Sequence, residues 1–154
     1  MYKKHRSHRV AASLIAATAL CSSASACAQL GAVIAAKSGE SAPQSLLNGA
    51  LRLRTSTDAG NTTINEYATN GGEIVAYTWQ GPTMPDLAGL LGKYAGSYRT
   101  GAAEAAAAPD GNLHASRVVR PDVVVESGGP MRGYAGRAWL PGALPPGVTA
   151  DDLR

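Results

Sequence analysis

Few residues in this 154-residue chain have the chemistry that catalysis needs. His114 is the only histidine beyond residue 28, and Ser127 and Asp122 are the residues that would complete a Ser–His–Asp triad with it. A nucleophile elbow needs glycine two positions before the serine, and Val125 stands there instead. Ser127 also begins Ser127–Pro130, which is typical of a turn between strands. We therefore predict no catalytic residues, and an envelope hydrolase that uses His114 with Ser127 is kept as an alternative.

Metal and cofactor sites have equally little support in the sequence. A zinc site needs several histidines, cysteines or clustered carboxylates. Asp151 and Asp152 are the only adjacent carboxylates, and they lack the regular oxygen-ligand spacing of a calcium loop. The glycine-rich stretch 128–136 lacks the Gly-Lys-Ser/Thr sequence of a phosphate-binding loop. We expect no metal and no cofactor.

The first 28 residues have the pattern of a secretory signal peptide. A basic start with four Lys and Arg precedes an apolar run over 10–20 and a stretch of small residues. The apolar run is about half the ~20 residues of a membrane-spanning helix. We predict cleavage after Ala28, where Ala26 and Ala28 satisfy the small-x-small rule, and a periplasmic or extracellular protein. Cleavage before Cys27 is the alternative, and it would permit a lipid anchor.

Removal of this leader changes the charge of the chain. Four of the 14 Lys and Arg lie in residues 1–28, whereas all 11 Asp and Glu lie beyond them. The remaining 10 basic and 11 acidic residues give a formal charge of −1. A surface close to neutral has no electrostatic footprint for a phosphate backbone, so we expect no nucleic-acid partner. No later segment is long and apolar enough to be a transmembrane helix.

The first half of the mature chain alternates between strand and turn patterns. Residues 29–50 are weakly patterned and are expected to form a flexible arm before a single domain over 51–154. Residues 51–57, 62–69 and 73–80 are predicted strands, and Asn70-Gly71-Gly72 predicts a hairpin between the last two. The third strand has apolar groups on both faces, which indicates a central strand covered on both sides. In a regular strand Val75, Tyr77 and Trp79 would share one face, and Ile74, Ala76 and Thr78 the other.

A helix is predicted from about residue 84 to 99. Leu87, Leu90, Leu91, Tyr94 and Tyr98 form an apolar stripe at helical spacing. Thr83 and Asp86 resemble a capping box. Residues 100–111 are rich in alanine and are predicted to be an exposed connector. Three segments at 113–119, 122–126 and 131–140 have strand character, the last two forming a second hairpin, and residues 148–154 are a tail or a short helical turn.

Strands followed by a helix and more strands, without β-α-β alternation, predict an α+β fold. We expect an antiparallel sheet of about five strands and two hairpins, with one amphipathic helix on a face. Exposed aromatic and basic residues would offer a partner surface, and the candidates are Trp79, Met84, Arg132, Tyr134, Arg137 and Trp139. Core filling by the aromatics and solvated charge for the arginines are the alternative interpretation.

Three sequence blocks resemble one protein family. They are residues 79–87, 123–129 and 131–141, and the closing residues 144–154 fit the same pattern. The chain resembles, over about 28–154, a family of small exported bacterial proteins known as the domain of unknown function DUF2844. The resemblance implies export and a compact domain, and Gln29-Leu30-Gly31 fits the start of the mature part. Pro130 stands where the family pattern has histidine.

The resemblance supplies no activity, cofactor or catalytic residue. We therefore expect an exported, non-catalytic module that binds an unknown protein or polymer of the cell envelope. The alternatives are the hydrolase and a lipid-anchored protein attached through Cys27.

Overall fold

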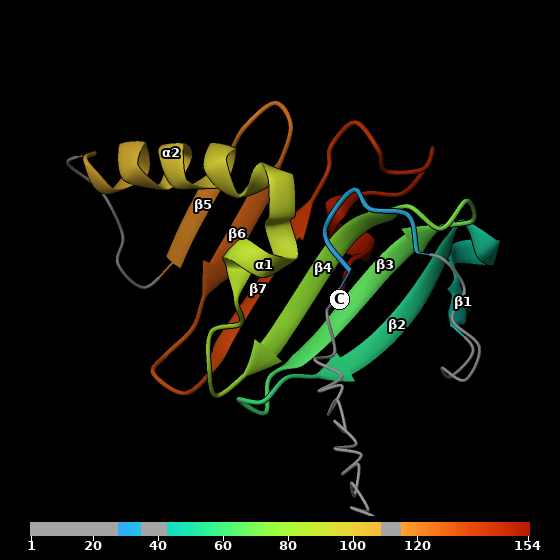
Figure 1. The fold of residues 1–154 in the computed structure, drawn as a ribbon, viewed down its shortest axis with the longest axis horizontal. Coiled ribbons are helices and arrows are strands. Elements are labelled where there is room, and N and C mark those ends of the chain that lie inside the picture. Colours follow the sequence, from blue (N-terminus) through green and yellow to red (C-terminus); the bar gives the residue numbers. More distant parts are fainter. Residues whose placement is uncertain (1–27, 35–42, 109–114) are drawn as a thin grey trace, which may run out of the picture.

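The computed structural model describes residues 28–34, 43–108 and 115–154. Seven antiparallel strands form one sheet in the order β1-β2-β3-β4-β7-β6-β5 (Figure 1). The strands are β1 (Gln44–Leu46), β2 (Leu51–Thr57), β3 (Thr63–Thr69), β4 (Ile74–Gly81), β5 (Ala115–Val119), β6 (Val124–Gly128) and β7 (Tyr134–Trp139). The helical segments between β4 and β5 carry the chain to the far edge of the sheet, and β7 returns to pair with β4.

This architecture confirms the predicted α+β class and the antiparallel sheet. The predicted number of about five strands is wrong. Six strands match the six predicted strand segments, and the seventh, β1, has only three residues and lies within the predicted arm. Three residues are too few to display an alternating pattern, and β1 exists because its backbone pairs with β2 at the edge of the sheet.

Both predicted hairpins are present, but the second turn lies further along the chain than expected. Asn70-Gly71-Gly72 connects β3 to β4, with Gly72 at a positive φ of 85°. Strand β6 continues through Ser127 to Gly128, so Ser127 is a strand residue and not a turn residue. The turn is closed by the Gly133 N–H, which donates to the Pro130 carbonyl at 2.9 Å.

Strand β4 is covered on both faces, as predicted, because its residues from Ile74 to Trp79 are all buried. The predicted division of these residues between the faces is wrong at the start of the strand. A β-bulge shifts the register where Tyr67 and Ala68 of β3 pair with β4. Ile74 therefore packs with Tyr77 and Trp79 in one cluster, while Val75 packs in the other.

The helical region is longer and more broken than the predicted helix. It comprises α1 (Leu87–Leu91), the 3-10 turn η2 (Gly92–Tyr94) and α2 (Ala95–Ala106). Gly92 has a positive φ of 52° and packs against the Gln29 side chain, which explains the break. Because α2 continues to Ala106, the first part of the predicted connector over 100–111 is helical.

The apolar stripe of the helical region is confirmed, but its predicted cap is not. Leu90 and Leu91 are buried, and Leu87, Tyr94 and Tyr98 pack against their cluster. The cap is Asp86 itself, whose side chain accepts from the Gly89 N–H at 3.1 Å. Thr83 instead bonds to Thr62 beside the β2–β3 turn.

Two chain segments lie on opposite faces of the sheet. Leu30 is 1% exposed and packs with Leu90 and Leu91 on the face that the helices cover (Figure 1). On the other face Leu153, at 3% exposed, packs with Val75 and Trp139. The described parts of the predicted arm, residues 29–34 and 43–50, thus include a core residue and β1.

The segment after β7 ends in the short helical turn that was one of the two predicted possibilities, η3 (Ala150–Asp152). It is held by Tyr67, whose hydroxyl donates to the Arg154 carbonyl and accepts from the Arg154 N–H at 3.0 Å. This C-terminal segment covers only part of its sheet face.

Candidate functional site

Ser127 and Asp122 each have a hydrogen-bond partner outside the candidate triad. Ser127 in β6 pairs its hydroxyl with Ser116 at 2.9 Å, and Asp122 accepts from the Ser97 hydroxyl at 2.8 Å. Asp122 lies in the bend before β6, and Ser127 is the fourth residue of that strand. His114 lies outside the described residues, and the pairing of His114 with Ser127 alone stays a prediction.

The described ranges contain no group of three or more His, Cys, Asp and Glu side chains able to hold a metal ion. No helix within them has the length and apolar character needed to cross a bilayer.

The six residues of the predicted partner surface do not form one patch. Trp79 is 3% and Trp139 is 6% exposed, and they lie in separate core clusters on opposite faces of the sheet. Met84 is 42% exposed between β4 and α1, and Arg132 is exposed in the β6–β7 turn. Both tryptophans therefore fill the core, as the alternative interpretation held.

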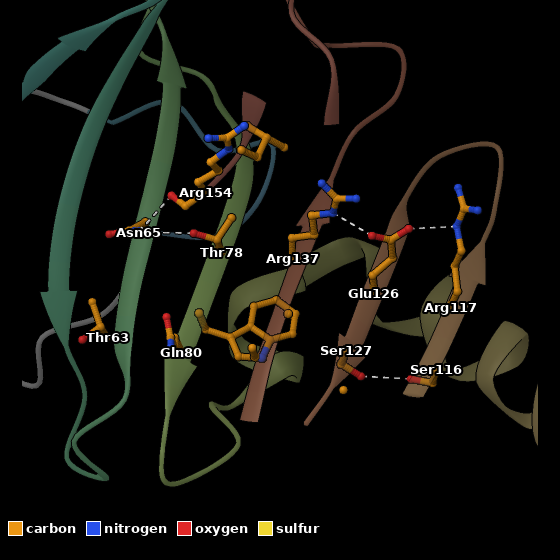
Figure 2. Close-up of a pocket in the computed structure, with 15 residues that line it drawn as sticks. Thr63, Asn65, Thr78, Gln80, Ser116, Arg117, Glu126, Ser127, Arg137 and Arg154 are labelled. Atoms are coloured by element: carbon orange, nitrogen blue, oxygen red, sulfur yellow. Dashed lines mark hydrogen bonds and ion pairs between the residues drawn. The ribbon is translucent and has the colours of Figure 1, made fainter. Parts of the chain in front are cut away.

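A cavity of about 640 Å³ opens on the sheet face that the C-terminal segment only partly covers. Figure 2 shows that its labelled side chains come from five adjacent strands and from the C-terminal segment. We call it the sheet-face cavity, and its lining residues used below are Thr63, Asn65, Thr78, Trp79, Gln80, Arg117, Glu126, Gly136, Arg137 and Arg154.

One half of the sheet-face cavity is lined by neutral hydrogen-bonding groups. The Asn65 amide donates to the Thr78 hydroxyl and to the Arg154 carbonyl, both at 3.3 Å (Figure 2). Gln80 and Thr63 continue this row toward the exposed end of the strands. Strand alternation explains the row, because Thr78 and Gln80 point away from the face that buries Tyr77. Amides and hydroxyls both donate and accept, so the row suits a ligand rich in hydroxyl groups.

The other half of the sheet-face cavity is lined by a chain of ion pairs. One Glu126 carboxylate oxygen lies 2.6 Å from Arg137 Nε, and the other lies 2.9 Å from Arg117 Nε (Figure 2). Arg137 also lies 3.5 Å from Asp151 and donates to the Ala150 carbonyl. Two arginines and two carboxylates compensate one another, so this half offers no net charge to a ligand. Pairs this exposed stabilise the fold by about 0–1 kcal/mol each.

The aromatic residue of the cavity is held by a glycine on the neighbouring strand. Gly136 pairs with Trp79, and a Cβ built on Gly136 would lie 2.3 Å from the Trp79 ring. The absence of a side chain at Gly136 of β7 therefore makes room for the indole, which packs in the core cluster beneath the helices. Its Nε1 is buried and has no hydrogen-bond partner in the described part of the chain.

Hydrogen bonds in the neighbouring C-terminal segment lower the pKa of one carboxyl group, that of Asp152. The Thr149 backbone N–H and hydroxyl donate to Asp152 at 2.8 and 2.9 Å, and these bonds hold the pKa of Asp152 below its usual value. They form the capping box of η3.

Sequence reasoning found only part of this site. Trp79 and Arg137 were among the predicted partner residues, whereas Asn65, Gln80 and Glu126 were missed. Each of them follows an apolar residue, which points to the other face of the strand. The pairing of β4 with β7, which brings them into one cavity, has no local sequence signature.

Comparison with known proteins gives one match. The family described as "Protein of unknown function (DUF2844)" matches residues 25–153. No curated protein and no solved structure is significantly similar to the chain.

Proposed function

The chain belongs to the DUF2844 family of proteins of unknown function, and on that basis we propose that it is an exported, non-catalytic module that binds a glycan polymer of the bacterial cell envelope. Its ligand site in this proposal is the sheet-face cavity. The single observation that carries the proposal is the row of amide and hydroxyl groups beside mutually compensated charges.

The chemistry of the cavity favours a neutral, hydroxyl-rich ligand. Thr63, Asn65, Thr78 and Gln80 offer donors and acceptors side by side, as a polyol requires. A strongly anionic polymer would need arginines that are not already engaged, and two of the three lining arginines, Arg117 and Arg137, pair with Glu126. Most of the exposed lining area is apolar, and the polar groups of the row lie within it.

The shape of the cavity favours a polymer over a small molecule. Its lining comes from β3, β4, β7, β6 and β5, which are consecutive neighbours in the sheet. Four inter-strand spacings correspond to about 19 Å. An open hollow of this length suits an extended chain lying across the strands.

The export part of the proposal is supported by the leader pattern of residues 1–28. The mass of the protein recovered from a cell fraction outside the cytoplasm tests it directly. A mass that corresponds to residues 29–154 supports the proposal. An intact chain in the cytosol would refute export.

Titration of the chain 29–154 with soluble peptidoglycan glycan fragments, followed by amide chemical shifts, tests the ligand. We expect shifts at the sheet-face cavity, and about 2- to 10-fold weaker binding for Gln80→Ala, because one hydrogen bond contributes about 0.5–1.5 kcal/mol. Gln44→Ala is the matched control, since Gln44 is an exposed amide on β1 outside the cavity. Equal affinities for both variants, shifts confined to the opposite face, or no binding would refute the proposal.

A further inference from the structure

The bond between Ala28 and Gln29, where we predict cleavage, lies against buried polar groups of the sheet. The Ala28 carbonyl accepts a hydrogen bond from the Tyr77 hydroxyl of β4. Tyr77 is 1% exposed, and its hydroxyl also lies 3.0 Å from Glu66 Oε2 of β3. Glu66 is itself only 7% exposed.

In the uncleaved chain the Tyr77 hydroxyl faces two acceptors. The Tyr77 hydroxyl has a single hydrogen, and the Ala28 carbonyl and the Glu66 carboxylate are both acceptors. A hydroxyl cannot donate to both at once. An additional donor beside Tyr77 would remove this competition.

The position of Gln29 is fixed by residues that follow it. The Leu30 N–H donates to the Leu90 carbonyl at 2.8 Å, and the Ala32 N–H donates to the Gln29 carbonyl at 2.9 Å. Leu30 is 1% exposed in the core beneath the helices. Cleavage of the preceding bond therefore leaves the Gln29 nitrogen in place, about 2.2 Å from where the Ala28 oxygen had been.

We propose that cleavage after Ala28 creates an α-ammonium group on Gln29 that binds the Glu66 carboxylate and the Tyr77 hydroxyl. Tyr77 then donates to Glu66 and accepts from the ammonium group, so its single hydrogen no longer serves two acceptors. Removal of the leader thereby completes a polar site inside the fold. This inference rests on the proposed export, because only an exported chain meets the processing enzyme.

Other charged groups surround this site. Arg54 Nε of β2 lies 3.9 Å from Glu66 Oε1. The Lys93 stem lies close to Gly31, and Asp58 and Asp86 line a hollow together with Gln29. Glu66 is distinguished from Asp58 and Asp86 by its hydrogen bond to the hydroxyl that contacts the scissile peptide.

The test removes the α-charge from a chain that begins at Gln29. Glutaminyl cyclase acts on an N-terminal glutamine: the α-nitrogen attacks the side-chain amide carbon, ammonia leaves, and a neutral pyroglutamate results. The unfolded chain is treated and refolded, and its melting temperature at pH 7 is compared with that of the untreated chain. We expect the cyclised form to melt lower, and the difference to shrink in Glu66→Gln, since only the part that comes from the contact of Gln29 with Gly92 remains.

Glu104→Gln is the matched control, because Glu104 pairs with Arg120 at 2.9 Å on the surface of α2. It should keep the difference between the free and cyclised forms. Tyr77→Phe, which keeps the buried ring, is the second variant if Glu66→Gln does not fold, and it should shrink the difference. An equal difference in the parent and Glu66→Gln, or an exported protein that begins at Cys27 or carries pyroglutamate, would overturn the inference.

This outcome is separable from failure of the proposed function. Glu66 and Tyr77 are not part of the sheet-face cavity. Glu66→Gln should therefore bind the glycan fragments like the parent chain whatever its melting temperature. Loss of glycan binding in the parent chain would refute the ligand assignment and leave the ammonium site standing.

Discussion

Substitution of Gly136 by alanine tests how Trp79 is accommodated. The added Cβ would lie 2.3 Å from Trp79 Cζ2 and 2.5 Å from the Glu126 carbonyl oxygen, whereas ordinary contact begins at 3.4 Å. The indole would have to move by the difference, 1.1 Å, yet Trp79 is 3% exposed within the core. The carbonyl belongs to β6, which pairs with β7 and cannot retreat without loss of that pairing.

Overpacking of a core by one methyl group costs about 1–3 kcal/mol, and the clash with backbone places Gly136→Ala at about 3 kcal/mol. For a domain of this size about 1 kcal/mol lowers the melting temperature by about 4 °C, so we expect a loss of about 12 °C. Urea and thermal unfolding of the chain 29–154 measure both quantities. Gly142→Ala is the control, since a Cβ there meets nothing within 4 Å. Equal stability of the two variants would refute this account of the cavity.

Three further predictions concern the helices, the β6–β7 turn and the C-terminal segment. Gly96→Ala should stabilise α2 by about 1 kcal/mol in urea unfolding, since a Cβ there meets no atom. Gly101→Ala should lower the stability of the fold, because its Cβ would lie 2.5 Å from a side chain of β5. The opposite order of stability would contradict the packing. Arg132→Gly should raise the free energy of unfolding by about 1 kcal/mol, because Arg132 has a φ of 66°, and an Arg132→Ala variant that gained as much would contradict a backbone cause. The pKa of the Asp152 carboxylate, measured by NMR, should lie below the usual aspartate range. The stability that the η3 cap contributes is therefore present at neutral pH and is lost as the pH falls through that lowered pKa. An unchanged titration midpoint of Asp152 in Thr149→Val would contradict the capping bonds.

Local patterns predicted the individual elements well where the pattern was long. The strand over 51–57 and the hairpin at Asn70-Gly71-Gly72 follow from alternation and from residues that tolerate positive φ. The stripe from Leu87 to Tyr98 predicted which side of the helices packs. The end of the helix was missed because glycine and proline around an alanine run resembled a connector, whereas α2 packs on β5 and continues to Ala106.

The site was harder to predict than the elements. Exposure cannot be read from residue type, so Trp79 and Trp139 were placed on a surface although the structure buries both. The bulge opposite Tyr67 moved Val75 to the other face, which no periodicity reveals. Asn65 and Gln80 belong to no sequence motif. They line one cavity with Glu126 only through the order of the strands.

The leader pattern, the family, the α+β class and most hairpins and strands could be predicted, because these depend on composition and on contacts between residues close in the chain. The order of the strands in the sheet could not, because it depends on contacts between distant residues. The pairing of β4 with β7 joins residues about 60 positions apart and builds the sheet-face cavity, with Gly136 leaving room for Trp79. Such a pairing is selected by the packing of the whole sheet, so no short stretch of sequence carries it.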